Sequence, residues 1–330
     1  MRPFTYAKPT DAAAAIRAVA GAAETRFLAG GTTLYDLMKL DLERPAGIVD
    51  ITALPGLSAV EAGDPRELVF GALARMADAA ADPVLRRDYP ALTESLDKAA
   101  SQQLRNMATL GGNVLQRTRC GYFRGGEPYA CNKRVPGSGC AAIEGLDRGH
   151  AVLGGSEACI AVYPGDWAVA LAAFDAVVDV LGPNGPRSIP FDAFHREPGT
   201  TPAVETTLAR DELILRIRVP KTPLGRASTY HKIRDRESYA FALASAAVAL
   251  RMEGGTVREA RIALGGLATR PRRAREAERA LVGGPLTADT ARTAGEAALR
   301  GARAGRHNAF RIELGVRTVA DALLIARTRV

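Results

Sequence analysis

Residues 26–40 read RFLAGGTTLYDLMKL, a short apolar run followed by paired glycines, paired threonines and an amphipathic segment. RFLAGG predicts a β-strand that ends in glycines, and LYDLMKL predicts a short turn of helix. The paired glycines can adopt positive φ and let backbone N–H groups approach a ligand closely. Such a loop at the start of a helix suits a phosphate or pyrophosphate, although a tight strand-to-helix turn explains it about as well. The stretch matches neither G-x-G-x-x-G nor the P-loop pattern.

The segments on either side extend this stretch into alternating strands and helices. FTY, near the N-terminus, predicts a strand, and GIVDI predicts another after the helix. Thr10 and Asp11 provide a cap for a helix through AAAAIRAVA. Residues 1–55 are therefore expected to form a β–α–β–α–β subdomain.

Two further units follow along the chain. In residues 56–222 we expect strands at LVFGAL, AVVDVLG and ELILRIRVP, and helices in MADAAAD, ALTESLDKAA and PGDWAVALAAF. PNGP at 183–186 predicts a turn between two strands, and VPKTPLGR marks a boundary near residue 222. Residues 223–330 predict an α+β unit, with strands at ASTYHKIR and VREARIALGG and helices at REAERALV, TADTARTAGEAAL and GVRTVADALLIAR.

The composition is that of a globular protein. Hydrophobic residues make up 47% of the 330 residues and charged residues 24%, which argues against general disorder. The longest apolar run, FALASAAVAL, is too short to cross a bilayer, and the N-terminus is expected to carry no export signal. The net charge is +8, but glutamates interrupt the densest basic stretch, ATRPRRAREAER at 268–279. We expect a solvated face there rather than a nucleic-acid footprint.

A second glycine-rich stretch, ATLGGNVLQ, spans residues 108–116. Thr109, Gly111, Gly112 and Asn113 offer hydroxyl, amide and backbone donors within five residues, although an ordinary Asn-bearing turn has the same composition. Two such loops in neighbouring units can hold the two ends of one extended nucleotide cofactor. The pair is therefore more informative than either loop alone.

All four cysteines of the chain lie in one Gly- and Pro-rich segment, with the spacing C-x10-C-x8-C-x18-C. An iron–sulfur cluster, a zinc ion and two disulfides are equally compatible with this spacing. The C-x2-C pairs that are typical of zinc ribbons do not occur. Basic residues flank the cysteines, as suits a negatively charged cluster: Arg117, Arg119, Arg124, Lys133 and Arg134. The four histidines are scattered without ligand spacing, and no Ser-His-Asp order supports hydrolysis.

AGGTTL near residue 30, ATLGGN near 110, YPGD at 163–166 and YHK at 230–232 occur in an order similar to that of the flavin-binding subunits of the xanthine dehydrogenase family. That family includes the carbon monoxide dehydrogenase flavoproteins, and the likeness spans essentially the whole chain. The cysteine segment resembles the narrower group of flavin subunits from three-subunit bacterial aldehyde oxidoreductases. The resemblance implies an α+β chain: a vanillyl-alcohol-oxidase (PCMH)-type FAD-binding domain of two α/β subdomains, plus a small α+β C-terminal domain.

The resemblance also implies the cofactors and the residues that hold them. One loop would wrap the FAD pyrophosphate: Arg26, Phe27, Leu28, Ala29, Gly30, Gly31, Thr32, Thr33 and Leu34. Thr109, Gly112 and Asn113 would lie along the pyrophosphate and flavin, Asp166 would contact ribityl or ribose hydroxyls, and Lys232 would lie near the isoalloxazine. A [4Fe–4S] cluster would be ligated by Cys120, Cys131, Cys140 and Cys159. The chain departs from many relatives at Gly165, where they carry serine.

The function implied is that of an electron-transfer subunit in a heterotrimer. FAD would receive electrons from a [2Fe–2S] small subunit, which a molybdenum-cofactor large subunit supplies, and deliver them to an external acceptor. The chain itself would contribute no catalytic residue to substrate oxidation, bind no nucleic acid and enter no membrane. The resemblance implies periplasmic export with a signal-bearing partner, and a cytoplasmic enzyme is equally compatible. A stand-alone flavin oxidase or dehydrogenase and a zinc- or disulfide-stapled scaffold are the alternatives.

Overall fold

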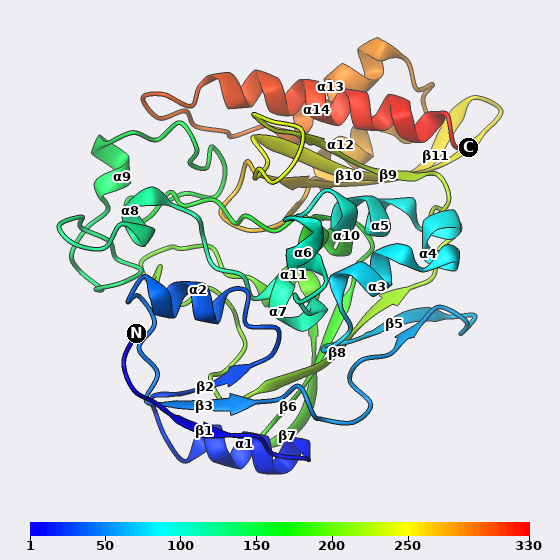
Figure 1. The fold of residues 1–330 in the computed structure, drawn as a ribbon. Coiled ribbons are helices and arrows are strands. Elements are labelled where there is room, and N and C mark those ends of the chain that lie inside the picture. The colour runs from blue at the N-terminus through cyan, green and yellow to red at the C-terminus, as the bar shows by residue number, and fades with distance from the viewer.

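Three β-sheets organise the chain, and the computed structural model describes residues 1–330. Figure 1 shows a small N-terminal sheet at one end, a longer sheet beside it and a helix-covered C-terminal sheet at the other end. Helices and strands mix throughout, so the expected α+β class is confirmed.

The N-terminal unit has the expected β–α–β–α–β order. Its three strands are parallel, in the order β1-β3-β2. The first helix begins where predicted, because the Asp11 carboxylate accepts a hydrogen bond from the Ala14 amide at 2.7 Å. The elements are β1 Thr5–Ala7, α1 Ala12–Ala20, β2 Thr25–Leu28, α2 Leu34–Lys39 and β3 Gly47–Asp50.

The second unit is built on a five-stranded antiparallel sheet, in the order β4-β5-β8-β6-β7. The predicted PNGP turn joins two of its strands, and Gly185 takes a φ of +97° there. The strands are β4 Val60–Glu61, β5 Glu67–Gly71, β6 Val177–Gly182, β7 Gly185–Pro190 and β8 Leu213–Pro220. The helices are α3 Met76–Ala81, α4 Pro83–Asp88, α5 Pro90–Asp97, α6 Gln102–Arg105, α7 Leu110–Val114, α10 Trp167–Ala173 and α11 Phe191–Phe194.

Residues 117–159, here called the cysteine loop, connect α7 to α10 with little regular structure. Only two single-turn helices occur in it, α8 Gly121–Arg124 and α9 Ala141–Glu144. Figure 1 shows the loop as an irregular lobe at one side of the molecule, between α2 and the C-terminal helices. Its order therefore depends on contacts with its neighbours.

The C-terminal unit is a four-stranded antiparallel sheet, in the order β12-β11-β10-β9, with three helices. The run FALASAAVAL, considered above only for its length, provides most of a central strand. One set of its residues packs under the C-terminal helices and the alternate set joins the core of the second unit. Both faces of the strand are buried, so the run is apolar apart from Ser245. The elements are β9 Ser228–Ile233, β10 Ala244–Glu253, β11 Thr256–Gly265, β12 Arg272–Arg273, α12 Arg275–Leu281, α13 Ala288–Ala298 and α14 Phe310–Arg327.

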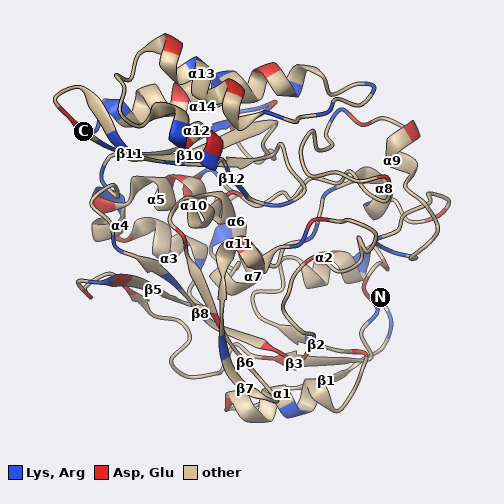
Figure 2. Ribbon diagram, turned by 180° about the vertical axis from the view of Figure 1, so that it is seen from behind, with Lys and Arg blue, Asp and Glu red and all other residues tan.

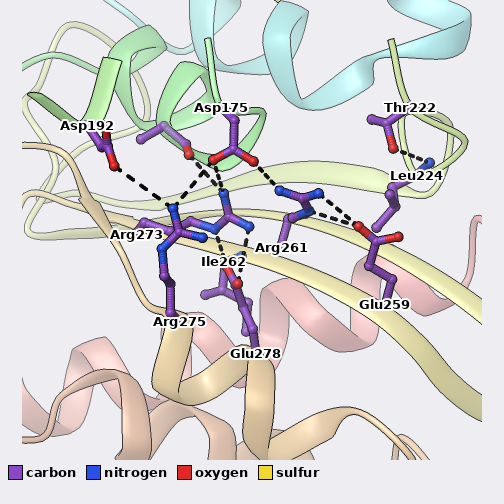
Figure 3. Close-up of polar contacts among 11 residues, drawn as sticks. Asp175, Asp192, Thr222, Leu224, Glu259, Arg261, Ile262, Arg273, Arg275 and Glu278 are labelled. Carbon is purple, nitrogen blue, oxygen red and sulfur yellow. Dashed lines mark hydrogen bonds and ion pairs between the residues drawn. The ribbon is translucent and has the colours of Figure 1, made fainter. Parts of the chain in front are cut away.

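Arginines fasten this sheet to the second unit. Asp175, just after α10, forms ion pairs with Arg261, with Arg273 at 2.7 Å and with Arg275 at 3.8 Å (Figure 3). Arg273 also pairs with Glu278, and only 6% of its side chain is exposed. The expectation of a solvated face at 268–279 is therefore wrong for Arg273, whose charge is compensated within the interface.

Elsewhere in the chain, basic and acidic residues lie among one another. Figure 2 shows Lys and Arg interspersed with Asp and Glu on the helices and loops seen from behind. No helix of the chain combines the length and apolarity needed to cross a membrane.

Candidate functional site

A cavity of about 600 Å³ lies where the N-terminal unit, the second unit and the cysteine loop meet. Every residue of the predicted loop 26–34 lines it, and so do Thr109 and Gly112 of the second glycine stretch. The two loops, which are far apart in sequence, therefore border one space. The structure brings together most of the residues predicted for an extended cofactor.

The first glycine loop approaches the start of the second closely at Gly30. A Cβ added to Gly30 would lie 2.0 Å from the carbonyl oxygen of Met107, and one added to Gly111 would lie 2.9 Å from the Cβ of Ala72. Gly31 takes a φ of +73°, which side chains rarely allow. Glycine is thus required both for the approach of the loops and for the bend that follows β2.

Backbone donors of the first loop are free. The amides of residues 29–33 donate to no acceptor within the chain. In the second loop, Thr109 caps α7, its hydroxyl accepting from the Gly112 amide at 3.3 Å. A row of free amides beside a glycine turn fits the oxygens of a phosphate or pyrophosphate. The residues present therefore fit the phosphate part of a dinucleotide cofactor.

Asn113, on α7, is buried and is not among the residues that line the cavity. Its side-chain amide approaches the sulfur of Met76 at 3.3 Å, and its Oδ1 is buried without a partner. It does not line the cavity, so the predicted contact with the cofactor stays a prediction.

Asp166 and Lys232 lie outside the cavity lining and pair with each other. Lys232 Nζ lies 2.9 Å from Asp166 Oδ2 and also donates to the Lys98 carbonyl at 2.9 Å, while the Tyr230 hydroxyl donates to Asp166 Oδ1 at 2.5 Å. Their side chains are 5% and 1% exposed, and burial raises the pKa of the Asp166 carboxyl. The structure places these two residues together but not in direct contact with the space that the loops enclose.

Gly165, the position that departs from many relatives, is also explained by packing. A Cβ there would lie 2.6 Å from the ring of Tyr163, whose hydroxyl donates to the Val114 carbonyl at 3.1 Å. A serine at this position would displace that ring, which lines the cavity.

Sequence reasoning missed the opposite wall of the cavity. Part of it is apolar, and the rest comes from an irregular segment with no recognisable motif. It includes Ile51, Leu73, Ala203, Val204, Leu208 and Leu213. The one signal present was the long connection between β7 and β8, since loops of that length often carry function.

His195, one of the four histidines that show no ligand spacing, lies buried in the cavity lining. Its Nε2 lies 2.9 Å from the Val114 carbonyl, and its Nδ1 is buried without a partner. Three aromatic rings surround it, and burial lowers the pKa of His195 to about 4. The imidazole is therefore neutral, with Nε2–H donating to the carbonyl.

The four cysteines gather in one lobe without forming a disulfide. Cys131 and Cys140 face each other across an isolated antiparallel bridge, and a hydrogen bond from Cys159 lowers the pKa of Cys140 to about 6. Burial chiefly, with a smaller contribution from two neighbouring thiols, raises the pKa of Cys120. No group of three or more His, Cys, Asp or Glu side chains is arranged to hold a metal ion.

His150 approaches one of the cysteines. Its Nε2 lies 3.2 Å from the sulfur of Cys120. Cys159 is the buried member of the set and also lines the cavity, so the lobe and the cavity share a wall.

The basic residues around the cysteines are mostly engaged elsewhere. Arg117, Arg119, Arg124 and Lys133 each pair with a carboxylate, and Arg134 donates to the carbonyl of Tyr129. Their predicted role in balancing a cluster's charge is therefore reduced, because four of the five share three carboxylates, those of Asp36, Glu43 and Glu205.

Comparison with known proteins agrees with this arrangement. Residues 2–222 match the family described as FAD binding domain in molybdopterin dehydrogenase, and residues 228–326 match the CO dehydrogenase flavoprotein C-terminal domain. The chain is 45% identical to the aldehyde oxidoreductase FAD-binding subunit PaoB of Escherichia coli, over 100% of both chains.

More distant relatives extend the comparison. The chain is 28% identical to the carbon monoxide dehydrogenase medium chain of Hydrogenophaga pseudoflava, over 90% of this chain and 86% of that one. A solved carbon monoxide dehydrogenase structure from the same organism superposes with a TM-score of 0.77 at 26% identity, covering 99% of this chain and 98% of the other. The chain therefore belongs to the FAD-binding medium subunits of the xanthine dehydrogenase family, which are oxidoreductase subunits of molybdenum hydroxylases.

Proposed function

We propose that this chain is the FAD-binding electron-transfer subunit of a heterotrimeric, molybdenum-containing aldehyde oxidoreductase. It would take electrons from a [2Fe–2S] small subunit, supplied by a molybdenum-cofactor large subunit, and pass them to an external acceptor. The observation that carries the proposal is the cavity bordered by both glycine loops in a chain of this family. The 45% identity over the full length supports the aldehyde oxidoreductase assignment.

The chain's own residues would hold the cofactor. The free amides of residues 29–33 would donate to the pyrophosphate, and Thr109 and Gly112 would lie along its other side. FAD supplies chemistry in both one- and two-electron steps when it is bound. Contacts of Asp166 and Lys232 with the ribityl chain and the flavin ring remain part of the prediction. The division into residues 1–55, 56–222 and 223–330 belongs to the same proposal.

We also propose that Cys120, Cys131, Cys140 and Cys159 ligate a [4Fe–4S] cluster. Their gathering in one lobe, free of disulfides, supports this assignment. The absence of a site for a single ion is compatible with it, because a cluster spreads its four thiolates around several irons. The imidazole of His150, beside Cys120, would donate a hydrogen bond to sulfur.

The test is purification of the chain with its co-eluting partners, followed by flavin, iron and molybdenum analysis of each separated subunit. We expect FAD and about four irons on this chain, and molybdenum on another subunit only. A chain without flavin refutes the flavin assignment. Tightly bound zinc in place of iron refutes the cluster and favours the scaffold alternative.

A further inference from the structure

Arginines at the start of the cysteine loop reach across to the N-terminal unit. Arg117 Nη1 lies 2.6 Å from Glu43 Oε1. Arg119 Nη1 lies 3.0 Å and Arg124 Nη2 lies 2.9 Å from the same Asp36 oxygen. Asp36 belongs to α2, the helix that follows the glycine loop. Both acidic partners in the N-terminal unit thus follow the predicted pyrophosphate loop closely in sequence, Asp36 by two residues and Glu43 by nine.

The same loop is also tied to the opposite wall of the cavity. Arg117 Nε lies 2.6 Å and Lys133 Nζ lies 2.8 Å from the carboxylate of Glu205, and Lys133 donates to the carbonyl of Pro202 at 3.0 Å. Although burial acts in the other direction, the charges of Arg117 and Lys133 lower the pKa of Glu205, so it is ionised near neutral pH. Arg117 therefore bridges two walls of the cavity through a single guanidinium.

These side chains are part of the cavity itself. Glu43, Arg117, Lys133 and Glu205 line it, together with Cys159. Their side chains are between one-tenth and one-quarter exposed, so the pairs are screened less than surface ion pairs. Part of the contacts that order the cysteine loop therefore also shape the cavity.

We propose that the cysteine loop is a clamp, which holds the N-terminal unit in the position that binds FAD through Asp36 and Glu43. The inference rests on the proposed function. A loop with only two single-turn helices has little order of its own, so a cluster that fixes its cysteines would also fix its arginines. FAD binding and cluster retention would then strengthen each other, because a coupling between two binding sites is reciprocal.

The test combines the substitutions Asp36→Asn and Glu43→Gln in one chain. Both keep the shape of the side chain and remove the charge that pairs with arginines of the cysteine loop. The Glu43 carboxylate also lies 4.0 Å from Arg26 Nε, a longer contact that Asp36 does not share, so Asp36→Asn is measured alone as well. The control is Asp41→Asn, because Asp41 pairs at 2.8 Å with Arg44 of the same segment and not with the cysteine loop. FAD affinity is measured by titrating flavin-free protein, and iron is counted separately.

We expect the double variant to bind FAD roughly 10- to 100-fold more weakly than the wild type, and the control to change less than about twofold. Removing iron from the wild type with a chelator should weaken FAD binding by a similar factor. In the double variant, where the clamp is already open, iron removal should have little further effect.

Two results would overturn the inference. Unchanged FAD affinity in the double variant refutes the clamp, and unchanged affinity after iron removal from the wild type refutes the coupling. Failure of the proposed function itself would be seen already in the wild-type chain and not only in the variants. A wild-type chain that binds no FAD at all contradicts the flavin assignment, and one that carries no iron contradicts the cluster assignment.

Discussion

Substitution of Gly30 by alanine tests the geometry of the proposed FAD site most directly. The added Cβ would lie 2.0 Å from the Met107 carbonyl oxygen and 3.2 Å from the Cα of Ala108. Ordinary contacts begin near about 3.4 Å, so the two glycine loops must separate by more than about 1 Å. The φ of Gly30 is not in the left-handed region, so the conflict is with the neighbouring loop and not with its own backbone.

The magnitude follows from this overlap. Forcing a methyl group into a packed contact costs about 1–3 kcal/mol, and here the strain falls on the loops that would grip the pyrophosphate. If the cofactor-bound form bears this cost, the dissociation constant of FAD rises roughly 5- to 150-fold. If the loops separate instead, the aligned amides are lost and the affinity falls by a comparable amount.

The assay is FAD titration of flavin-free protein, followed through flavin fluorescence. The fluorescence of Trp167 checks independently that the variant is folded. Trp167 is the one tryptophan of the chain and is fully buried in the second unit. Gly63→Ala is the matched control, since a Cβ there meets nothing within 4 Å. If Gly30→Ala and Gly63→Ala bind FAD with the same affinity as the wild type, these loops do not form the cofactor site.

Three further predictions concern stability. The pKa of His195 is about 4 in the folded chain and about 6.5 when unfolded, so below pH 6.5 protons bind preferentially to the unfolded chain. Stability should fall by roughly 3 kcal/mol from pH 6.5 to pH 4, and His195→Gln should flatten that part of a urea-unfolding pH profile. Lys232→Met should lower the free energy of unfolding by about 3–5 kcal/mol, because it leaves Asp166 buried without its cation. Adding Asp166→Asn should restore much of that stability in thermal melts. Equal losses of stability in the single and the double variant would contradict the pairing. Asp11→Ala should lower the free energy of unfolding by about 1 kcal/mol, measured in urea, whereas an unchanged midpoint would show that the cap contributes nothing.

Much of the fold could be predicted from the sequence, because local patterns match local structure. The Asp11 cap, the strand and helix around the glycine pair and the PNGP hairpin are each specified within a few residues. The central strand β10 was not recognised, since burial on both faces removes the alternation that identifies a strand.

The part of the site formed by the two glycine-rich loops could be recognised in the sequence, because glycines mark tight bends and close backbone approaches. Residues 26–34, Thr109, Gly111 and Gly112 border one cavity, and their contacts with a cofactor stay a prediction. The ion pairs of Arg117 with Glu43 and Glu205 were not predictable, because they join segments 74 and 88 residues apart in the sequence. The burial of His195 was not predictable either, because the aromatic rings around it include Tyr163, which is distant in the sequence.

The strand β10 has a consequence for how the chain behaves as a whole. Ala247 and Ala249 belong to the same core as Phe70 and Trp167, whereas Ala246 and Val248 belong to the core under the C-terminal helices. A fragment ending near residue 222 would expose to solvent the side of α10 that packs against β10 and β11. The detached remainder would expose the face of its sheet that packs against α10. We therefore expect the two halves to stabilise each other through this strand, so that neither is an independent folding module.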